Sequence, residues 1–233
     1  PSGTAILWAT YLGGSASDRA RGMSVDPSGR AALAGITSSP DFPTLRPLQP
    51  DRGDTSSDGC VSQFDSQGRL AFSTYLGGNQ PDQANAIAAD AAGNLYVTGQ
   101  TASSNFPTRN ALRSTRPASG NCRIVIRVGS FVITGTALCR SAFVTKINPG
   151  NATMEYSTYL GGSTSNSSAG EGDLGLAIAA ASDGSAVVAG QTVSPDFPVT
   201  ASAFQRTYGG TRDAFLARLN PAGNALTFAT FLG

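Results

Sequence analysis

The sequence predicts an all-β protein made of tandem repeats, each built from four antiparallel strands. Three observations predict this class. A five-residue motif recurs along the chain, strand-like segments recur between its copies, and Gly, Pro, Asn and Asp bound those segments. No segment shows a sustained apolar period of 3.6 residues, so helix should be scarce.

The recurring motif is Thr-Tyr-Leu-Gly-Gly, at residues 10–14, 74–78 and 158–162, with a fourth, partial copy at 230–233. The second copy carries a long insertion and the third a shorter one. When both are set aside, the motif returns at a nearly constant interval, from one copy to the next. A repeat of this size cannot bury its own apolar faces, so it must stack on its neighbours.

Four strands are expected in each unit. The first is rich in aromatic and β-branched residues and ends in the motif: 6–12, 70–76, 154–160 and 226–232. The second and third form a hairpin, at 86–90 and 95–99 in the second copy, around a turn at 92–94. The fourth precedes an Asn-Pro or similar turn: 59–64, 142–147 and 214–219.

Four antiparallel strands repeated in tandem are typical of β-propeller blades. The Tyr-Leu-Gly-Gly motif, the turn at 26–29, the Asp-Phe-Pro corner at 41–43 and the segment 213–221 resemble the bacterial seven-bladed β-propeller repeat family. The resemblance implies a large secreted or surface-attached bacterial protein, generally without an assigned activity. A parallel β-solenoid is the alternative fold, although the repeat is long for one solenoid coil.

We therefore expect one partial β-propeller domain over residues 1–233, with about three four-stranded antiparallel blades plus one extra N-terminal strand. The repeat units are about 1–66, 67–148 and 149–219, with the start of a fourth at 220–233 and an inserted hairpin at 120–140. Three blades are too few to close a ring. Further blades of a longer protein, a second copy of the chain, or another protein subunit would complete it.

The amino-acid composition limits the classes of partner that the chain is expected to bind. The chain has 16 basic and 15 acidic residues, and 13% of its residues are charged, which argues against a nucleic-acid or other polyanion as partner. No apolar run is long enough to cross a bilayer, so no transmembrane segment is expected. The first residue is not Met and no signal peptide is recognisable, so we interpret the chain as a piece of a longer protein.

The three cysteines predict one disulfide. Cys122 and Cys139 bracket the insertion, which reads as a β-hairpin turning near Gly129 and Ser130. If Gly129 pairs with Val132, the two cysteines lie opposite each other, and a disulfide there fits an oxidising compartment. Two reduced thiols are the alternative. Cys60 aligns with inward-facing phenylalanines, so a buried free thiol is expected there rather than a reactive one.

The hairpin is also the strongest candidate for binding a partner. It carries more apolar surface than a solvated loop needs. The candidate contact residues are Ile124, Ile126, Val128, Phe131 and Ile133. The alternative is that the hairpin covers part of its own propeller.

Candidate catalytic groups are few. The chain has no His, which removes catalysis by Ser-His-Asp or Cys-His and His-ligated metals. The remaining conspicuous residues recur once per unit, so we assign them structural roles in turns and packing. They are Asp18, Asp82, Asp173, Phe42, Phe106, Phe197, Tyr11, Tyr75 and Tyr159. No catalytic residue, cofactor or metal ligand is expected. Calcium is conceivable at the oxygen-rich loop 163–173 or near Asp54 and Asp58, but neither has dedicated ligand spacing.

These observations favour a non-catalytic binding or scaffold module, secreted, on the cell surface or in the periplasm. Its contacts would come from propeller loops or from the hairpin at 122–139, to a protein or a polysaccharide. Two other functions stay open. One is a polysaccharide-directed lyase or glycosidase whose carboxylates lie in inserted loops or further blades. The other is an accessory subunit of a membrane-associated complex.

Overall fold

The computed structural model describes residues 3–54, 56–117, 121–128, 131–163 and 172–233. Within these ranges every regular element is a β-strand, and no helix occurs. No helix that could span a membrane is therefore found among the described residues. The prediction of an all-β chain is confirmed.

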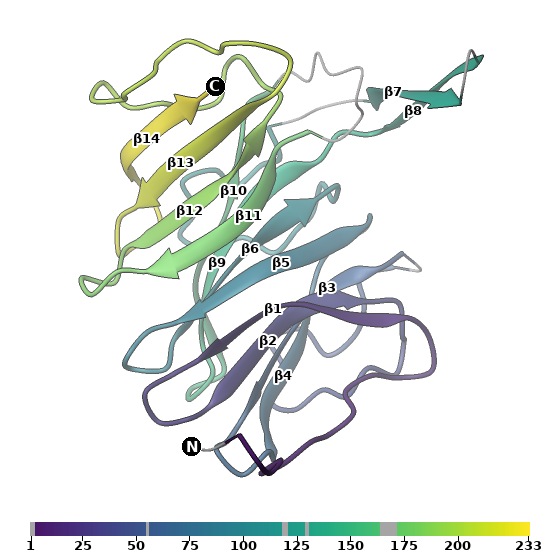
Figure 1. Ribbon diagram of the computed structural model, residues 1–233, viewed down its shortest axis with the longest axis vertical. Coiled ribbons are helices and arrows are strands. Elements are labelled where there is room, and N and C mark those ends of the chain that lie inside the picture. The colour runs from purple at the N-terminus through teal and green to yellow at the C-terminus, as the bar shows by residue number, and fades with distance from the viewer. Residues whose placement is uncertain (1–2, 55, 118–120, 129–130, 164–171) are drawn as a thin grey trace.

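Three four-stranded antiparallel sheets make up the body (Figure 1). The first contains β1 (Asp18–Val25), β2 (Ala31–Thr37), β3 (Asp58–Phe64) and β4 (Leu70–Leu76). The second contains β5 (Asp82–Ala89), β6 (Leu95–Thr101), β9 (Ser141–Asn148) and β10 (Thr153–Leu160). The third contains β11 (Leu174–Ala180), β12 (Ala186–Thr192), β13 (Asp213–Leu219) and β14 (Leu226–Leu232). The four strands of each sheet are ordered as they are along the chain.

A separate two-stranded hairpin interrupts the second sheet. Its strands are β7 (Asn121–Val128) and β8 (Phe131–Leu138), inserted between β6 and β9. Figure 1 shows this hairpin projecting from the side of the body, away from the three sheets.

The sheets stack face to face (Figure 1). The first strand of each sheet, β1, β5 or β11, lies at one edge of the stack beside its counterparts, and we call this the inner edge. One apolar core lies between the first and second sheets and another between the second and third. Each core contains an aromatic pair with ring centroids 4.5 Å apart: Phe106 with Phe143 in the first, and Phe197 with Phe215 in the second. Burial of each such side chain stabilises the fold by roughly 1.5 to 3 kcal/mol. Stacking thus buries the apolar faces that no single repeat could cover.

Each inner-edge strand carries a β-bulge at the same place in the repeat. The register shifts between Ala20 and Gly22 in β1, between Ala84 and Ala86 in β5, and between Gly175 and Ala177 in β11. The extra residues are Arg21, Asn85 and Leu176. A bulge leaves its extra residue out of the ladder and redirects its side chain. The repeat therefore places three different side chains at one equivalent, redirected position.

Residues 6–12 do not form the expected extra N-terminal strand. None of the described strands pairs with this segment, although its matching segments in the later copies form β4, β10 and β14. Leu12 nevertheless packs against the cluster of Phe42, Cys60 and Tyr75 on the first sheet. The segment therefore lies against that sheet, in the position of an outer strand of a neighbouring sheet. It has no hydrogen-bonded partner strand there, and a strand needs one.

Tyr11 differs from its counterparts for the same reason. Tyr75 and Tyr159 are buried, whereas Tyr11 is fully exposed. The ring of Tyr75 is enclosed by a loop and a strand of its own sheet. Tyr11 has no sheet of its own, so its side chain lacks that enclosure. The expectation that Tyr11 packs between blades is therefore wrong.

Candidate functional site

The repeated aspartates that begin the inner strands hold the Gly-Gly loops in place. Asp18 Oδ2 accepts hydrogen bonds from the Gly14 amide (2.9 Å) and the Ser39 hydroxyl (2.8 Å). Asp82 Oδ2 accepts equivalent bonds from Gly78 (2.6 Å) and Ser103 (2.7 Å). A carboxylate that accepts several N–H and O–H bonds fixes a loop that has no other ladder partner.

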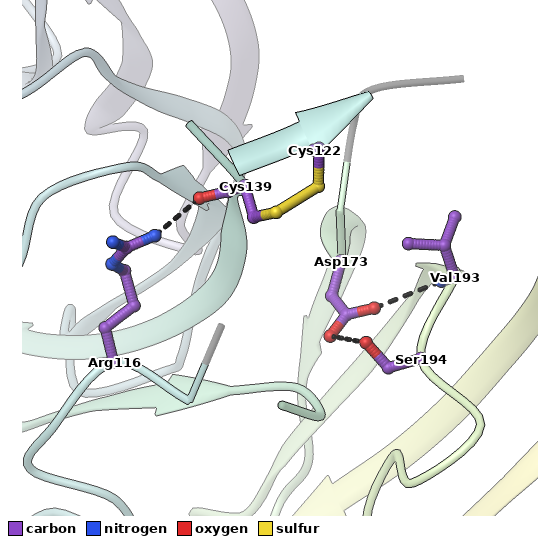
Figure 2. Close-up of a disulfide and its surroundings, with 6 residues drawn as sticks. All are labelled: Arg116, Cys122, Cys139, Asp173, Val193 and Ser194. Carbon is purple, nitrogen blue, oxygen red and sulfur yellow. Dashed lines mark hydrogen bonds between the residues drawn. A yellow bond between two sulfur atoms is a disulfide. The ribbon is translucent and has the colours of Figure 1, made fainter. Parts of the chain in front are cut away.

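Asp173 makes the fullest set of these contacts. Its Oδ2 accepts from the Gly162 amide (2.8 Å) and the Ser194 hydroxyl (3.0 Å). Its Oδ1 accepts from the Thr192 hydroxyl (2.6 Å) and the Val193 amide (3.1 Å). Figure 2 shows the carboxylate directed at Val193 and Ser194. All the hydrogen bonds described for this side chain hold the loops around the third sheet in place.

The Phe and Tyr positions form a second repeated unit. The Tyr75 hydroxyl donates to the Ser39 carbonyl (2.8 Å) and accepts from the Phe42 amide (2.9 Å). Tyr159 repeats this with the Ser103 carbonyl (2.9 Å) and the Phe106 amide (3.0 Å). In the third sheet the Tyr is replaced by Phe231, whose ring lies 6.1 Å from that of Phe197. These side chains anchor the corner loops to the sheets.

Burial changes the acidity of the inner-strand and neighbouring aspartates. Desolvation raises the pKa of Asp58 from 3.8 to about 7 and that of Asp82 from 3.8 to about 6. Desolvation also raises the pKa of Asp173. All three side chains are fully buried. A raised pKa can mark a general acid, but here the carboxyl groups of all three bond to the loops of their own repeats.

These shifts predict that the protein is less stable at pH 8 than at pH 5. The folded state binds more protons than the unfolded state between the unfolded pKa near 3.8 and the folded values of about 6 and 7. The free energy of unfolding therefore falls as pH rises through that window. Other aspartates have a lowered pKa, among them Asp41, Asp65 and Asp183. Their contribution to stability is lost only in stronger acid.

Calorimetric melting at pH 4 to 8 measures this dependence. The melting temperature should be highest near pH 4 to 5, and Asp82→Asn should flatten the decline toward pH 8. A melting temperature that climbs steadily from pH 5 to 8 would contradict the assignment.

The disulfide between Cys122 and Cys139 is confirmed, with Cα atoms 4.9 Å apart (Figure 2). The expected pairing register is wrong, because Val128 pairs with Phe131 and Cys122 pairs with Ala137. Only two residues then connect the strands, the commonest hairpin length. Cys139 lies just beyond β8, two residues from the partner of Cys122, and this offset is still within reach of a disulfide.

The hairpin begins at this disulfide. The Arg116 guanidinium donates to the Cys139 carbonyl (2.6 Å), which ties the base of the hairpin to the body (Figure 2). Of the five candidate contact residues, Ile133 has a described side chain, and it is 57% exposed. Its neighbour Val132 is also exposed. The side chains of the other four lie outside the described part of the structure: Ile124, Ile126, Val128 and Phe131.

Opening the disulfide should loosen the hairpin without loosening the sheets. Closing a loop of this size constrains a chain by roughly 3 kcal/mol, and within the described residues β7 and β8 pair only with each other. Hydrogen exchange of Cys122→Ser/Cys139→Ser should be faster in 121–138 and unchanged in β5, β6 and β9. Faster exchange in those three strands would show that the hairpin supports the body.

Cys60 is the remaining, free cysteine. It is buried, and burial raises the pKa of its thiol to about 12. A thiol held in its protonated form is a poor nucleophile. The side chain packs with Phe42 and Tyr75, so its described role is packing.

A cavity opens at the inner edge of the three sheets, where β1, β5 and β11 meet. Its volume is about 580 Å³. Each sheet contributes residues from the start of its inner strand. The lining consists of Arg19, Ala20, Arg21, Gln83, Asn85, Gln100, Leu174 and Leu176. A cavity of this size, bounded by convergent polar groups, is the default location for a ligand.

Two of the positions that line the cavity hold a different residue in each blade. The position after each inner-strand aspartate holds Arg19, Gln83 or Leu174. The bulged position, two residues further on, holds a different set: Arg21, Asn85 and Leu176. The positions that cap the loops and anchor the corners keep their residue type from copy to copy, whereas these two positions hold a different residue in every copy. Their convergence in one cavity makes it the candidate functional site.

Part of the chain is similar to a known family of repeats. Residues 71–107 match the β-propeller repeat model (SBBP). This segment runs from β4 through β5 and β6 to the corner loop at Phe106, so it contains one inner strand and the aspartate cap before it. The match supports a β-propeller repeat, and the three four-stranded antiparallel sheets have the form of propeller blades. A search of curated proteins found no match to the chain.

Sequence reasoning did not find the blade-lined cavity. A signal was present, because Arg, Gln and Leu replace one another at a fixed position in blades that otherwise agree closely. The aspartates near the proposed calcium loop act instead as caps: Asp54 accepts from Ser56 (2.6 Å) and Asp58 from Gly53 (2.9 Å). Residues 164–171 of the other oxygen-rich loop lie outside the described part. Within the described residues, no group of three potential ligands of a metal ion occurs.

Proposed function

We propose that this chain is a non-catalytic binding or scaffold module of a secreted or cell-surface protein, and that the β7–β8 hairpin docks a protein partner. The β-propeller repeat supports a binding or scaffold role in general terms. The disulfide supports an oxidising compartment such as the cell surface or periplasm.

The observation that carries the docking role is the position of the hairpin. It projects from the body (Figure 1), and its strands pair with each other and with no other described strand. Both of its edges can therefore accept a strand from another chain. Val132 and Ile133 place exposed apolar side chains on β8. The disulfide at its base limits the entropy lost on docking.

The lining of the inner-edge cavity supports a binding role over a catalytic one. It combines two guanidinium groups, three amides and two leucines with one alanine. A hydrolase or lyase acting on polysaccharides would instead use carboxyl groups beside its substrate. The buried aspartates with raised pKa bond to their own repeat loops rather than line this cavity.

Site-specific photo-crosslinking tests the docking role. A photoreactive side chain at Val132 should crosslink to a surface protein of the source cells, whereas one at Phe204, a more exposed site on the third blade, should not. The captured protein is then purified. Its affinity for Val132→Asp/Ile133→Asp should be at least tenfold lower than for the unmodified chain, and its affinity for Phe204→Asp unchanged. Equal affinities for the two variants would rule out docking by the hairpin.

A further inference from the structure

The inner-edge cavity has three chemically different walls because three blades meet there. The bulges turn Arg21, Asn85 and Leu176 out of their ladders, and all three line the cavity. The first blade thus supplies guanidinium groups, the second supplies amides, and the third supplies aliphatic carbon. This separation indicates a ligand with distinct anionic, hydroxylated and apolar parts.

The cationic wall is available to a ligand. Arg19 and Arg21 are exposed, and within the described residues neither forms an ion pair. Both also line an adjoining cavity of about 220 Å³, so their side chains reach open space on two sides. Each guanidinium group offers paired donors that match the two oxygens of a carboxylate.

The amide wall contains an acceptor without a donor. Gln100 donates through Nε2 to Gln83 Oε1 (2.8 Å), but the Oε1 atom of Gln100 is buried and has no hydrogen-bond partner. Gln100 is 6% exposed. A buried carbonyl oxygen left unpaired is destabilising, and in native proteins such atoms usually have a hydrogen-bond partner in the protein or an ordered water. Because this oxygen is buried, a ligand hydroxyl group would supply the missing donor only once the Gln100 amide turns toward the cavity.

Asn85 adds a second amide to this wall. Its Nδ2 donates to the Gly175 carbonyl of the third blade (3.0 Å), which fixes the side chain across the blade boundary. Its Oδ1 is a further acceptor on a residue that lines the cavity. The amide wall therefore presents one acceptor held within its own blade and one held by the third blade, and a hydrocarbon chain could not satisfy them.

The apolar wall consists of Leu174 and Leu176. Leu176 is 51% exposed although it lies on an inner-edge strand. An aliphatic side chain here can cover the C–H face of a sugar ring or a short hydrocarbon, but it cannot pair with a hydroxyl group. The hydroxyl groups of a bound molecule would therefore face β5 and β6, and its C–H face would contact β11.

We propose that this cavity binds a hydroxylated carboxylate, of which the uronate unit of an acidic polysaccharide is the chemical class that fits all three walls. The carboxylate contacts Arg19 and Arg21, a ring hydroxyl donates to Gln100, and the C–H face of the ring lies on Leu176. The volume of about 580 Å³ is within the ordinary range for ligand sites. This role is separate from the hairpin, which lies outside the cavity lining.

Calorimetric titration with trigalacturonate tests the proposal. The carboxyl-reduced trimer, which keeps the hydroxyl groups and the size, should bind at least tenfold more weakly. Arg21→Gln should weaken trigalacturonate binding at least tenfold, whereas Arg206→Gln, a matched loss of charge at an exposed site outside the lining, should leave it unchanged. Thermal melting of each variant verifies that it is folded.

A third variant separates hydroxyl recognition from charge. Gln100→Leu should weaken trigalacturonate binding and leave the weak binding of hexanoate, which has no hydroxyl group, unaltered. Three results would overturn the proposal. These are equal binding of the reduced and acidic trimers, equal effects of the two arginine variants, and binding of hexanoate as tight as that of trigalacturonate. A lack of trigalacturonate binding at millimolar concentration would overturn it as well, without bearing on the hairpin.

Discussion

Replacing Gly99 with Ala should destabilise the protein by about 3 kcal/mol or more and disorder the inner edge of the second blade. A Cβ atom at Gly99 would lie 1.9 Å from the Gln83 carbonyl oxygen and 2.9 Å from the Phe143 ring. The carbonyl oxygen belongs to the backbone of the β5 bulge, and the ring is fully buried in the core. Neither neighbour can move away without disturbing the bulge or the core.

Urea denaturation of Gly99→Ala measures this effect. The matched control is Gly135→Ala on the hairpin, where an added Cβ meets no atom within 4 Å, so its stability should be unchanged. Because the clash acts on Gln83 and the bulge at Asn85, Gly99→Ala should also lose trigalacturonate binding. A stability within about 0.5 kcal/mol of the unmodified chain would show that the bulge does not depend on this glycine.

The same close approach recurs in the other blades, which explains why glycine occupies this place in each. A Cβ at Gly35 would meet the Arg19 carbonyl oxygen at 2.2 Å, and one at Gly190 would meet that of Leu174 at 2.0 Å. Glycine allows the backbone of the bulge to approach its partner strand. Repeated glycines therefore shape the site that unrepeated side chains line.

Replacing Asp173 with Ala is the second change with a large expected effect, a loss of about 3 to 5 kcal/mol in the free energy of unfolding. Four donors lose their acceptor at once: the amides of Gly162 and Val193 and the hydroxyls of Thr192 and Ser194. Unpaired buried donors cost about 1 to 3 kcal/mol each. Relief from the desolvation of the carboxyl group offsets part of this cost.

Asp41→Ala is the matched control for Asp173→Ala. Asp41 caps the Gly-Gly loop of its own repeat through the Ser15 amide (2.7 Å), but it is exposed, so water can replace the lost bond. Its removal should cost no more than about 1 kcal/mol. Chemical denaturation of both variants at pH 5 compares them directly. Similar losses for the two variants would show that burial does not set the importance of these caps.

Repetition made most of the fold predictable. The expected first strands at 70–76 and 226–232 coincide with β4 and β14, and the one at 154–160 is β10 shortened by one residue. Such segments could be placed because aromatic and β-branched residues at equivalent positions in several copies are far stronger signals than in one. The capping roles of the repeated aspartates were predictable for the same reason, because a cap needs the same donor and acceptor in every blade.

The errors arose where a segment has no equivalent neighbour. Residues 6–12 have the sequence of an outer strand, but strand formation needs a hydrogen-bonded partner that sequence similarity does not supply. The hairpin occurs in one copy only, so no other copy could fix its register. Its disulfide was predictable because the connection of two cysteines depends on proximity and tolerates an offset of two residues.

The candidate site was hidden for a different reason. Arg21, Asn85 and Leu176 come from three different repeats, and each looks like an ordinary variable position of a strand. Their convergence depends on the stacking of three blades, and their direction depends on bulges, which show in the sequence only as an extra residue. In the sequence, these positions stand out only as places where the aligned repeats differ, and a search for shared residues does not find them.

The residues that line the inner-edge cavity, rather than those that cap the loops and anchor the corners, are expected to contact the ligand. Heteronuclear NMR during titration with trigalacturonate tests this most directly. We expect the side-chain amide signals of Gln83, Asn85 and Gln100 and the Nε–H signals of Arg19 and Arg21 to shift together, while the backbone amides of β7 and β8 stay in place. Shifts confined to the hairpin or to the corner loops, with the five inner-edge side chains unchanged, would contradict it.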